Sequence, residues 1–147
     1  MIIIAIFLFN CKEDSLESKS DYNPLLAKKL GADDYGMHKY VIAFLYRGEN
    51  RDRSKEESEK LQRAHMENIN KLAEEGKLVL AGPFLDDGDL RGIYIFDVVT
   101  VEEAKKLTET DPAIQAGSLR MELHPWYGSA AVMQINEIHN QIAKINI

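Results

Sequence analysis

Residues 61–84, LQRAHMENINKLAEEGKLVLAGPF, predict three successive elements: the end of a helix, a short strand and a turn. The helix is indicated by four residues that recur on one helical face, Leu61, His65, Ile69 and Leu72. Gly76 is suited to end it, since glycine readily adopts the left-handed conformation that follows many helices. Residues 78–81 (LVLA) are short and apolar enough for a strand, and Gly82-Pro83 predicts a turn. His65 stands out as a titratable ring on an otherwise apolar face.

The chain before this stretch predicts a strand and the beginning of the helix. Residues 39–46 (KYVIAFLY) are rich in β-branched and aromatic side chains, which is typical of a central strand covered on both faces. Ser54 and Glu57 have the spacing of a capping box, which satisfies the first free amide groups of a helix. The first helix is therefore predicted over residues 55–75.

The chain after this stretch predicts a hairpin and a second helix. Residues 86–89 (DDGD) indicate a turn and residues 92–99 (GIYIFDVV) a strand, so the second and third strands are expected to pair. Thr100 and Glu103 repeat the capping box and open a helix over residues 101–108.

The last part of the chain predicts a helical turn, a strand and a C-terminal helix. Asp111-Pro112 restarts a helix that Gly117 ends, since aspartate caps helices and proline suits their first position. Residues 119–124 alternate between apolar and polar side chains, the pattern of a half-buried strand. The final helix is indicated by helical spacing of Ala131, Ile135, Ile138 and Ile142.

These elements follow the order β-α-β-β-α-β, the split βαβ or ferredoxin-like arrangement. The predicted fold is therefore α+β: a four-stranded antiparallel sheet with both helices on one face, plus the C-terminal helix. The other face keeps apolar residues that need a cover. A second copy of the chain is the simplest cover, so a homodimer is predicted.

Composition and charge exclude several classes of function. The chain has 147 residues, which suits one domain, and a net charge of -6, which argues against a nucleic-acid-binding protein. Cys11 is the single cysteine, which excludes an intramolecular disulfide and a cysteine-based zinc site. The sequence contains no nucleophile elbow, phosphate-binding loop or dinucleotide fingerprint.

The first residues predict an export signal. Residues 1–9 (MIIIAIFLF) are uniformly apolar and have the length of a signal-peptide core. Cys11 and an acidic run follow, so residues 1–11 resemble a bacterial lipoprotein signal segment with Cys11 as the lipid attachment site. An exported protein anchored to the membrane, periplasmic or on the cell surface, is expected; a buried strand with a free thiol is the alternative. Residues 12–36 predict a polar linker.

Four stretches of the chain carry a family resemblance: AHMENINKL (64–72), EGKLVLAGPF (75–84), RGIYIF (91–96) and DPAIQAG (111–117). In their order and spacing they resemble the YCII-related domain family. The resemblance covers residues 37–127 and leaves residues 128–147 as a C-terminal helix outside it. It implies the fold of the dimeric α/β-barrel group, which agrees with the predicted elements. It also implies an enzyme that uses a histidine and an aspartate, which correspond here to His65 and Asp111.

His65 and Asp111 are the candidate catalytic residues. A histidine titrates near neutral pH, and a carboxylate that orients its ring keeps a proton donor or acceptor ready. Each residue also has a structural interpretation. An isolated histidine on an apolar face is more often a core residue, and Asp111 before Pro112 is a complete helix N-cap. Spacing alone favours the structural interpretation, the family resemblance favours the catalytic one, and both stay open.

Gly82, Pro83 and Arg91 are candidate substrate-binding residues. Gly82-Pro83 would place a rigid turn at the end of a strand, and Arg91 would reach an anionic group nearby. Ordinary turn chemistry and a solvated surface charge are the simpler interpretations of these residues.

Metal binding has weak support in the sequence. His38 and His124 fall on the first and last strands, which are neighbours in a ferredoxin-like sheet, but a third ligand at a fixed spacing is missing. The acidic turn at residues 86–89 lacks the later glutamate of an EF-hand loop and is expected to be a solvated turn. No metal and no cofactor are predicted.

The sequence thus predicts a small enzyme domain that performs cofactor-free acid–base chemistry of lyase or isomerase type on a small organic molecule. His65 would move the proton and Asp111 would orient it. The alternative is a non-catalytic dimeric module that binds a ligand or a protein in the same cleft, and a third possibility is a purely structural surface lipoprotein. Coupling between His65 and Asp111 favours the enzyme, whereas a ring bonded only to backbone favours the module.

Overall fold

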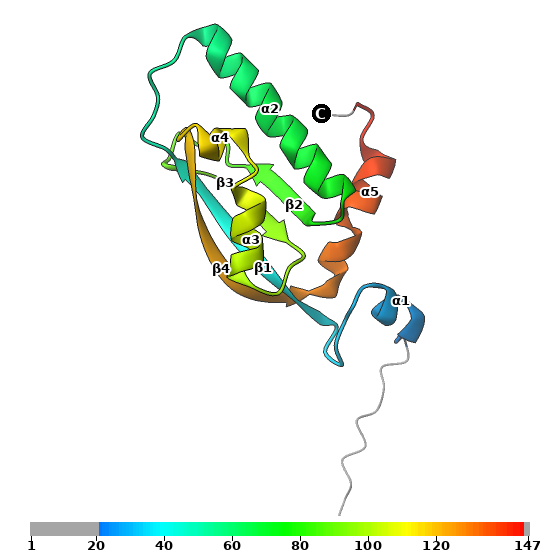
Figure 1. Cartoon of the computed structure of the whole chain (residues 1–147). Helices are drawn as coiled ribbons and strands as arrows, with labels where there is room; N and C mark the ends of the chain where they lie inside the picture. Colours follow the sequence, from blue (N-terminus) through cyan, green and yellow to red (C-terminus); the bar gives the residue numbers. More distant parts are fainter. Residues whose placement is uncertain (1–20, 146–147) are drawn as a thin grey trace, which may run out of the picture.

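The computed structural model describes residues 21–145 as one sheet with helices packed against it (Figure 1). The predicted signal segment, residues 1–11, and the first part of the predicted linker lie outside the described residues. In chain order the elements are α1 (Pro24–Lys29), β1 (Met37–Arg47), α2 (Lys55–Glu74), β2 (Leu78–Pro83), β3 (Leu90–Phe96), α3 (Val101–Thr108), α4 (Pro112–Gln115), β4 (Leu119–Ser129), the 3-10 helix η1 (Ala130–Gln134) and α5 (Ile135–Ile142).

The four strands form an antiparallel sheet in the order β2-β3-β1-β4. The central strands β1 and β3 pair with Ala43 opposite Tyr94. β1 also pairs with β4 along its whole length, with Met37 opposite Ser129 at one end. Because α2 connects β1 to β2 and α3 lies between β3 and β4, the predicted ferredoxin-like α+β fold is confirmed.

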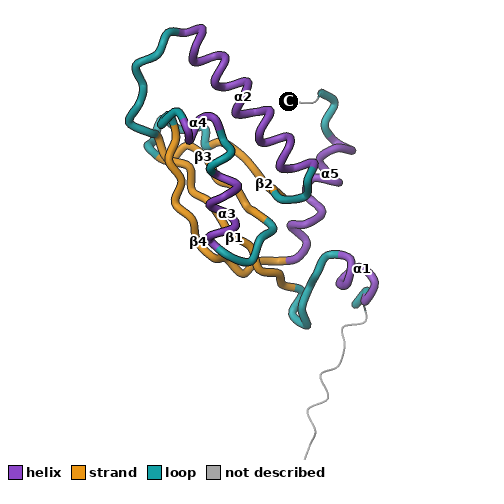
Figure 2. Tube along the Cα trace, in the orientation of Figure 1, coloured by secondary structure: helices purple, strands orange, loops and turns teal. Residues whose placement is uncertain are grey.

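The helices α2, α3 and α4 lie on one face of the sheet (Figures 1 and 2). Alternate residues of each strand point toward them, since successive side chains of a strand face opposite sides. Leu72 on the predicted apolar stripe of α2 is buried in this layer, and Ile69 packs against it. The core under the helices consists of Val41, Ala43, Leu45, Leu72, Leu78, Tyr94, Phe96, Val98 and Ala104.

Local signals set the ends of the two longer helices on this face. Ser54 accepts a hydrogen bond from the Glu57 amide and the Glu57 carboxylate accepts one from the Ser54 amide, so the predicted capping box of α2 is present. Thr100 and Glu103 cap α3 in the same way. Gly76 follows α2 with a φ of 69°, in the left-handed region that glycine adopts without strain. Both helices therefore lie within one residue of their predicted bounds.

The predicted turn at Gly82-Pro83 is wrong. Both residues continue β2, where they pair with Ile93 and Gly92 of β3. Since β2 is an edge strand, Pro83 can occupy a position at which its missing amide hydrogen breaks no ladder bond. The chain turns after β2, in the segment that contains the predicted acidic turn.

The C-terminal part of the chain covers part of the second face of the sheet. β4 extends beyond the predicted 119–124, because β1 offers it pairing partners as far as Met37. Val132 and Met133 of η1 then pack on a second buried cluster formed by Tyr40, Val79 and Ile95. The predicted C-terminal helix is present as α5, but it begins later than predicted, since Ala131 lies in η1 and α5 starts at Ile135. No helix within residues 21–145 is long and apolar enough to cross a membrane.

Candidate active site

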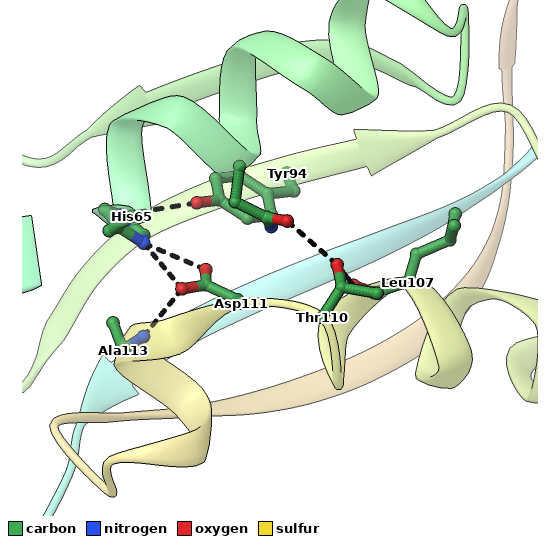
Figure 3. Close-up of polar contacts among 7 residues, drawn as sticks. His65, Tyr94, Leu107, Thr110, Asp111 and Ala113 are labelled. Carbon is green, nitrogen blue, oxygen red and sulfur yellow. Dashed lines mark hydrogen bonds and ion pairs between the residues drawn. The ribbon is translucent and has the colours of Figure 1, made fainter. Parts of the chain in front are cut away.

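The two predicted catalytic residues contact each other, although they lie 46 positions apart in the sequence. His65 projects from the middle of α2 and Asp111 immediately precedes α4 (Figure 3). The Nδ1 atom of His65 lies 3.0 Å from Oδ1 and 2.9 Å from Oδ2 of Asp111. Both residues are buried, and Asp111 is only 1% exposed. The structure therefore brings together the pair that the family resemblance implied.

Asp111 serves two partners at once. It is the N-cap of α4, and its Oδ1 accepts a hydrogen bond from the Ala113 amide at 2.8 Å. The same carboxyl group accepts from the His65 ring. A carboxylate only accepts hydrogen bonds, so Nδ1 of His65 donates, and in the neutral ring Nε2 then carries the lone pair. The structural and catalytic interpretations of Asp111 are thus compatible.

Tyr94 completes the polar chain and was missed by the sequence analysis. Its hydroxyl lies 3.4 Å from Nε2 of His65, and the two rings are stacked with centroids 6.4 Å apart. Burial raises the pKa of the Tyr94 hydroxyl, and the charge of Asp111 raises it further, so this hydroxyl stays protonated and donates toward Nε2. Its signal in the sequence was a tyrosine that alternates with Phe96 on the buried side of a strand, where the hydroxyl needs a partner.

His65 and Tyr94 line an open cleft of about 1130 Å³. The cleft follows one side of α2 and reaches the strands β2 and β3. The predicted substrate-binding residues Gly82, Pro83 and Arg91 all line it, although Gly82 and Pro83 belong to β2 and do not form the predicted turn. Around Gly82 the space that a side chain would occupy is open. The Arg91 guanidinium donates from Nη1 to two carbonyl groups of the acidic turn, so its position is set by the β2–β3 connection.

The C-terminal helix forms the far wall of this cleft. Ile135, Asn136, His139 and Asn140, which share one face of α5, line it. Asn136 fixes the helix in place, because its Nδ2 donates to the Leu78 carbonyl at 2.8 Å. The sequence left the role of this helix open, and its position at the cleft depends on this contact with β2.

The weak metal site at His38 and His124 is not formed. In the β1–β4 register His38 lies opposite Gly128 while His124 lies opposite Ile42, so the two rings are four positions apart. Each has another partner: His38 Nε2 is 2.8 Å from Asp97, and His124 Nε2 is 2.9 Å from Glu122. Within residues 21–145 there is no cluster of three or more side chains suited to hold a metal ion.

Comparison with known proteins matches the domain that contains this site. Residues 39–127 match the YCII-related domain, and this range includes His65, Tyr94 and Asp111. The uncharacterized protein YjpA of Bacillus subtilis (strain 168) is 31% identical over 62 residues, which are 42% of this chain and 71% of YjpA.

One similar solved structure is 5-chloro-2-hydroxyhydroquinone dehydrochlorinase (TftG) from Burkholderia phenoliruptrix AC1100, in complex with 2,5-dihydroxybenzoquinone. It aligns with a TM-score of 0.43 and 23% identity over 58% of this chain and 92% of the TftG chain.

Proposed function

The chain belongs to the YCII-related domain family, and we propose that its cleft is the active site of an enzyme that moves protons on a small organic molecule, in a reaction of lyase or isomerase type. The observation that carries this proposal is the chain of contacts from Asp111 through His65 to Tyr94 at the wall of the cleft. A histidine bonded only to backbone would have favoured the non-catalytic binding module.

The geometry supports a different chemical role for each of the three side chains. His65 would remove a proton from a substrate carbon or hydroxyl through Nε2, and Asp111 would stabilise the imidazolium ion that forms. The Tyr94 hydroxyl would donate to the substrate oxygen on which negative charge develops. His65 would then return the proton to a different atom, or to a leaving group, which completes an isomerisation or an elimination.

Proton transfer at carbon can be tested without knowing the natural substrate. A panel of enolisable carbonyl compounds in D₂O is incubated with the protein, and deuterium incorporation is followed by NMR. We expect catalysed exchange that falls by about 10²–10⁴-fold in His65→Gln and Asp111→Asn, the usual contribution of general acid–base catalysis.

The control for this experiment is Arg63→Gln, which changes an exposed residue of α2 that does not line the cleft. Its exchange rate is expected to equal that of the wild type. If no compound exchanges, or if His65→Gln is as active as the control, the alternative of a non-catalytic binding module is favoured.

We also propose that the domain is exported and held at a membrane by a lipid on Cys11. The support is the apolar run of residues 1–9 and the cysteine that follows it. Mass spectrometry of the chain from a membrane fraction would show a processed, lipid-modified chain that begins at Cys11. An unmodified chain that still begins at Met1 would contradict the proposal.

A further inference from the structure

Two arginines converge on one residue at the end of the cleft beside α4. Arg53 donates from Nη1 to the Ser118 hydroxyl at 2.6 Å, and Arg51 donates from Nη1 to the Ser118 carbonyl at 3.3 Å. All three residues line the cleft together with His65. Two guanidinium charges that contact the same residue repel each other, and a bound anion would relieve this repulsion.

Neutral groups hold both arginines in place, and no carboxylate forms a direct ion pair with either of them in the described residues. Besides Ser118, Arg53 bonds to the carbonyl groups of Asn50 and Ala116. The pKa of Glu57 is lowered mainly by the hydrogen bonds that its carboxylate accepts from Ser54 in the capping box. The positive charge of Arg53 makes a smaller contribution in the same direction.

The two ends of the short helix α4 contact His65 and Arg53. Asp111 at the beginning of α4 holds His65, and Ala116 just after its end accepts a hydrogen bond from Arg53. Five residues of helix rise by roughly 7–8 Å, which is the separation along α4 between the residue that holds His65 and the residue that accepts from Arg53. Leu45, Leu61 and Leu119 line the same cleft and offer contacts to an apolar body.

We propose that Arg51 and Arg53 bind a carboxylate group of the substrate, and that the rest of this substrate is an apolar or aromatic body that extends toward His65. This assignment rests on the function proposed above and names the substrate class of that cleft. The planar guanidinium fork suits a carboxylate, and the carbonyl contacts of Arg53 orient it before the ligand arrives.

The test compares benzoate with benzamide, which has nearly the same shape but no charge. Each is titrated into the full chain, and binding is followed through backbone amide signals in proton–nitrogen correlation spectra. We expect saturable shifts at Arg53 and Ser118 and an affinity for benzoate about tenfold or more above that for benzamide, since hydrogen bonds to charged groups are the stronger ones.

Variants separate binding of the anion from a purely structural role of Arg53. Arg53→Gln is expected to reduce benzoate affinity to the level of benzamide, whereas Arg53→Lys retains part of the preference because it retains the charge. Arg51→Gln is expected to weaken benzoate binding severalfold while the contacts of Arg53 stay intact, so the test does not depend on a variant that disturbs the loop. Arg63→Gln is the matched control, since Arg63 is exposed on α2 and does not line the cleft.

Equal affinity for benzoate and benzamide would overturn the proposal. So would losses in Arg53→Gln and Arg51→Gln no larger than the loss in Arg63→Gln. This outcome is distinguishable from failure of the proposed function. If His65→Gln keeps full exchange activity while the preference for benzoate persists, the carboxylate site is supported and the catalytic role of His65 is contradicted. If exchange depends on His65 but benzoate and benzamide bind equally, the catalytic role is supported and the carboxylate site is contradicted.

Discussion

A single carboxyl group connects the backbone of α4 to the ring of His65. Because Oδ1 of Asp111 already accepts from the Ala113 amide, the orientation of this group is determined before the histidine is considered. His65 then presents its Nε2 lone pair toward Tyr94 and the cleft. The cap of a four-residue helix thereby fixes which nitrogen of the histidine can accept a proton.

Asp111→Asn is therefore expected to reverse the protonation of the His65 ring. The asparagine oxygen keeps accepting from the Ala113 amide, so its NH₂ group faces Nδ1 of His65. A donor at this position requires Nδ1 to accept, and the proton moves to Nε2. Nitrogen-15 chemical shifts of the ring distinguish the two forms. The exposed His124 is the internal control, and a His65 ring that keeps its proton on Nδ1 in the variant would contradict the geometry.

At the scale of elements, the segment around α1 is joined to the sheet by polar contacts. α1 itself buries none of its residues. His38 on β1 bridges the Gly31 carbonyl, 2.9 Å from Nδ1, and the Asp97 carboxylate, 2.8 Å from Nε2. A Cβ at Gly31 would lie 3.2 Å from this ring, a tight contact, and the φ of 65° also favours glycine. Asp33 adds a hydrogen bond from Tyr127.

The contact at His38 makes stability dependent on pH. Partial burial alone would lower the pKa of His38, but the hydrogen bonds to Asp97 and Gly31, with the charge of Asp97, outweigh it, so this pKa is raised. A raised pKa stabilises the fold fully below the ordinary histidine pKa of about 6.5, and the contribution disappears as pH rises through the higher value in the folded protein.

We expect the free energy of unfolding, measured with urea, to fall as the pH rises above about 6.5, the ordinary pKa of histidine. His38→Gln should flatten this dependence, whereas His139→Gln, on exposed α5, should leave it unchanged. A wild-type curve with no decline above this pH, or one that survives in His38→Gln, would show that His38 does not connect the α1 segment to the sheet in a charge-dependent way.

At the scale of the whole molecule, the two faces of the sheet are covered unequally. The face under α2, α3 and α4 is closed by the chain itself, whereas η1 covers only part of the other face. On that other face Phe44 remains partly exposed and forms a T-shaped ring contact with His124, and Arg120 lies over the ring of Tyr46 at 4.3 Å. This remaining surface is where we propose that a second copy binds.

Sedimentation of the full chain is expected to show a dimer. Phe44→Glu should raise the dissociation constant by at least about tenfold, because it places a charge in an apolar contact that would be desolvated. Leu85→Glu introduces the same charge at a residue that is 98% exposed in the β2–β3 connection, and it should leave the dimer intact. A wild-type chain that stays monomeric at all concentrations would exclude this interface.

Several features were predictable because they depend on residues close together in the chain. The capping boxes at Ser54 and Thr100 act over three positions, and the glycine at 76 acts on the backbone next to it. The order of strands and helices then left the ferredoxin-like arrangement as the natural way to bury the apolar faces. Gly82-Pro83 was mistaken for a turn, because an edge strand accepts a proline that a central strand would not.

Tertiary structure alone placed the groups of the cleft. Asp111 was paired with His65 by family resemblance rather than by any spacing, and Tyr94 was found only through its contact with that histidine. The position of α5 depends on the contact of Asn136 with β2, and the meeting of Arg51 and Arg53 at Ser118 depends on the β1–β4 register. Periodicity and capping act between residues a few positions apart, so the sequence by itself determines them. A site built from distant residues forms only when the packing of the helices brings their side chains within hydrogen-bond distance.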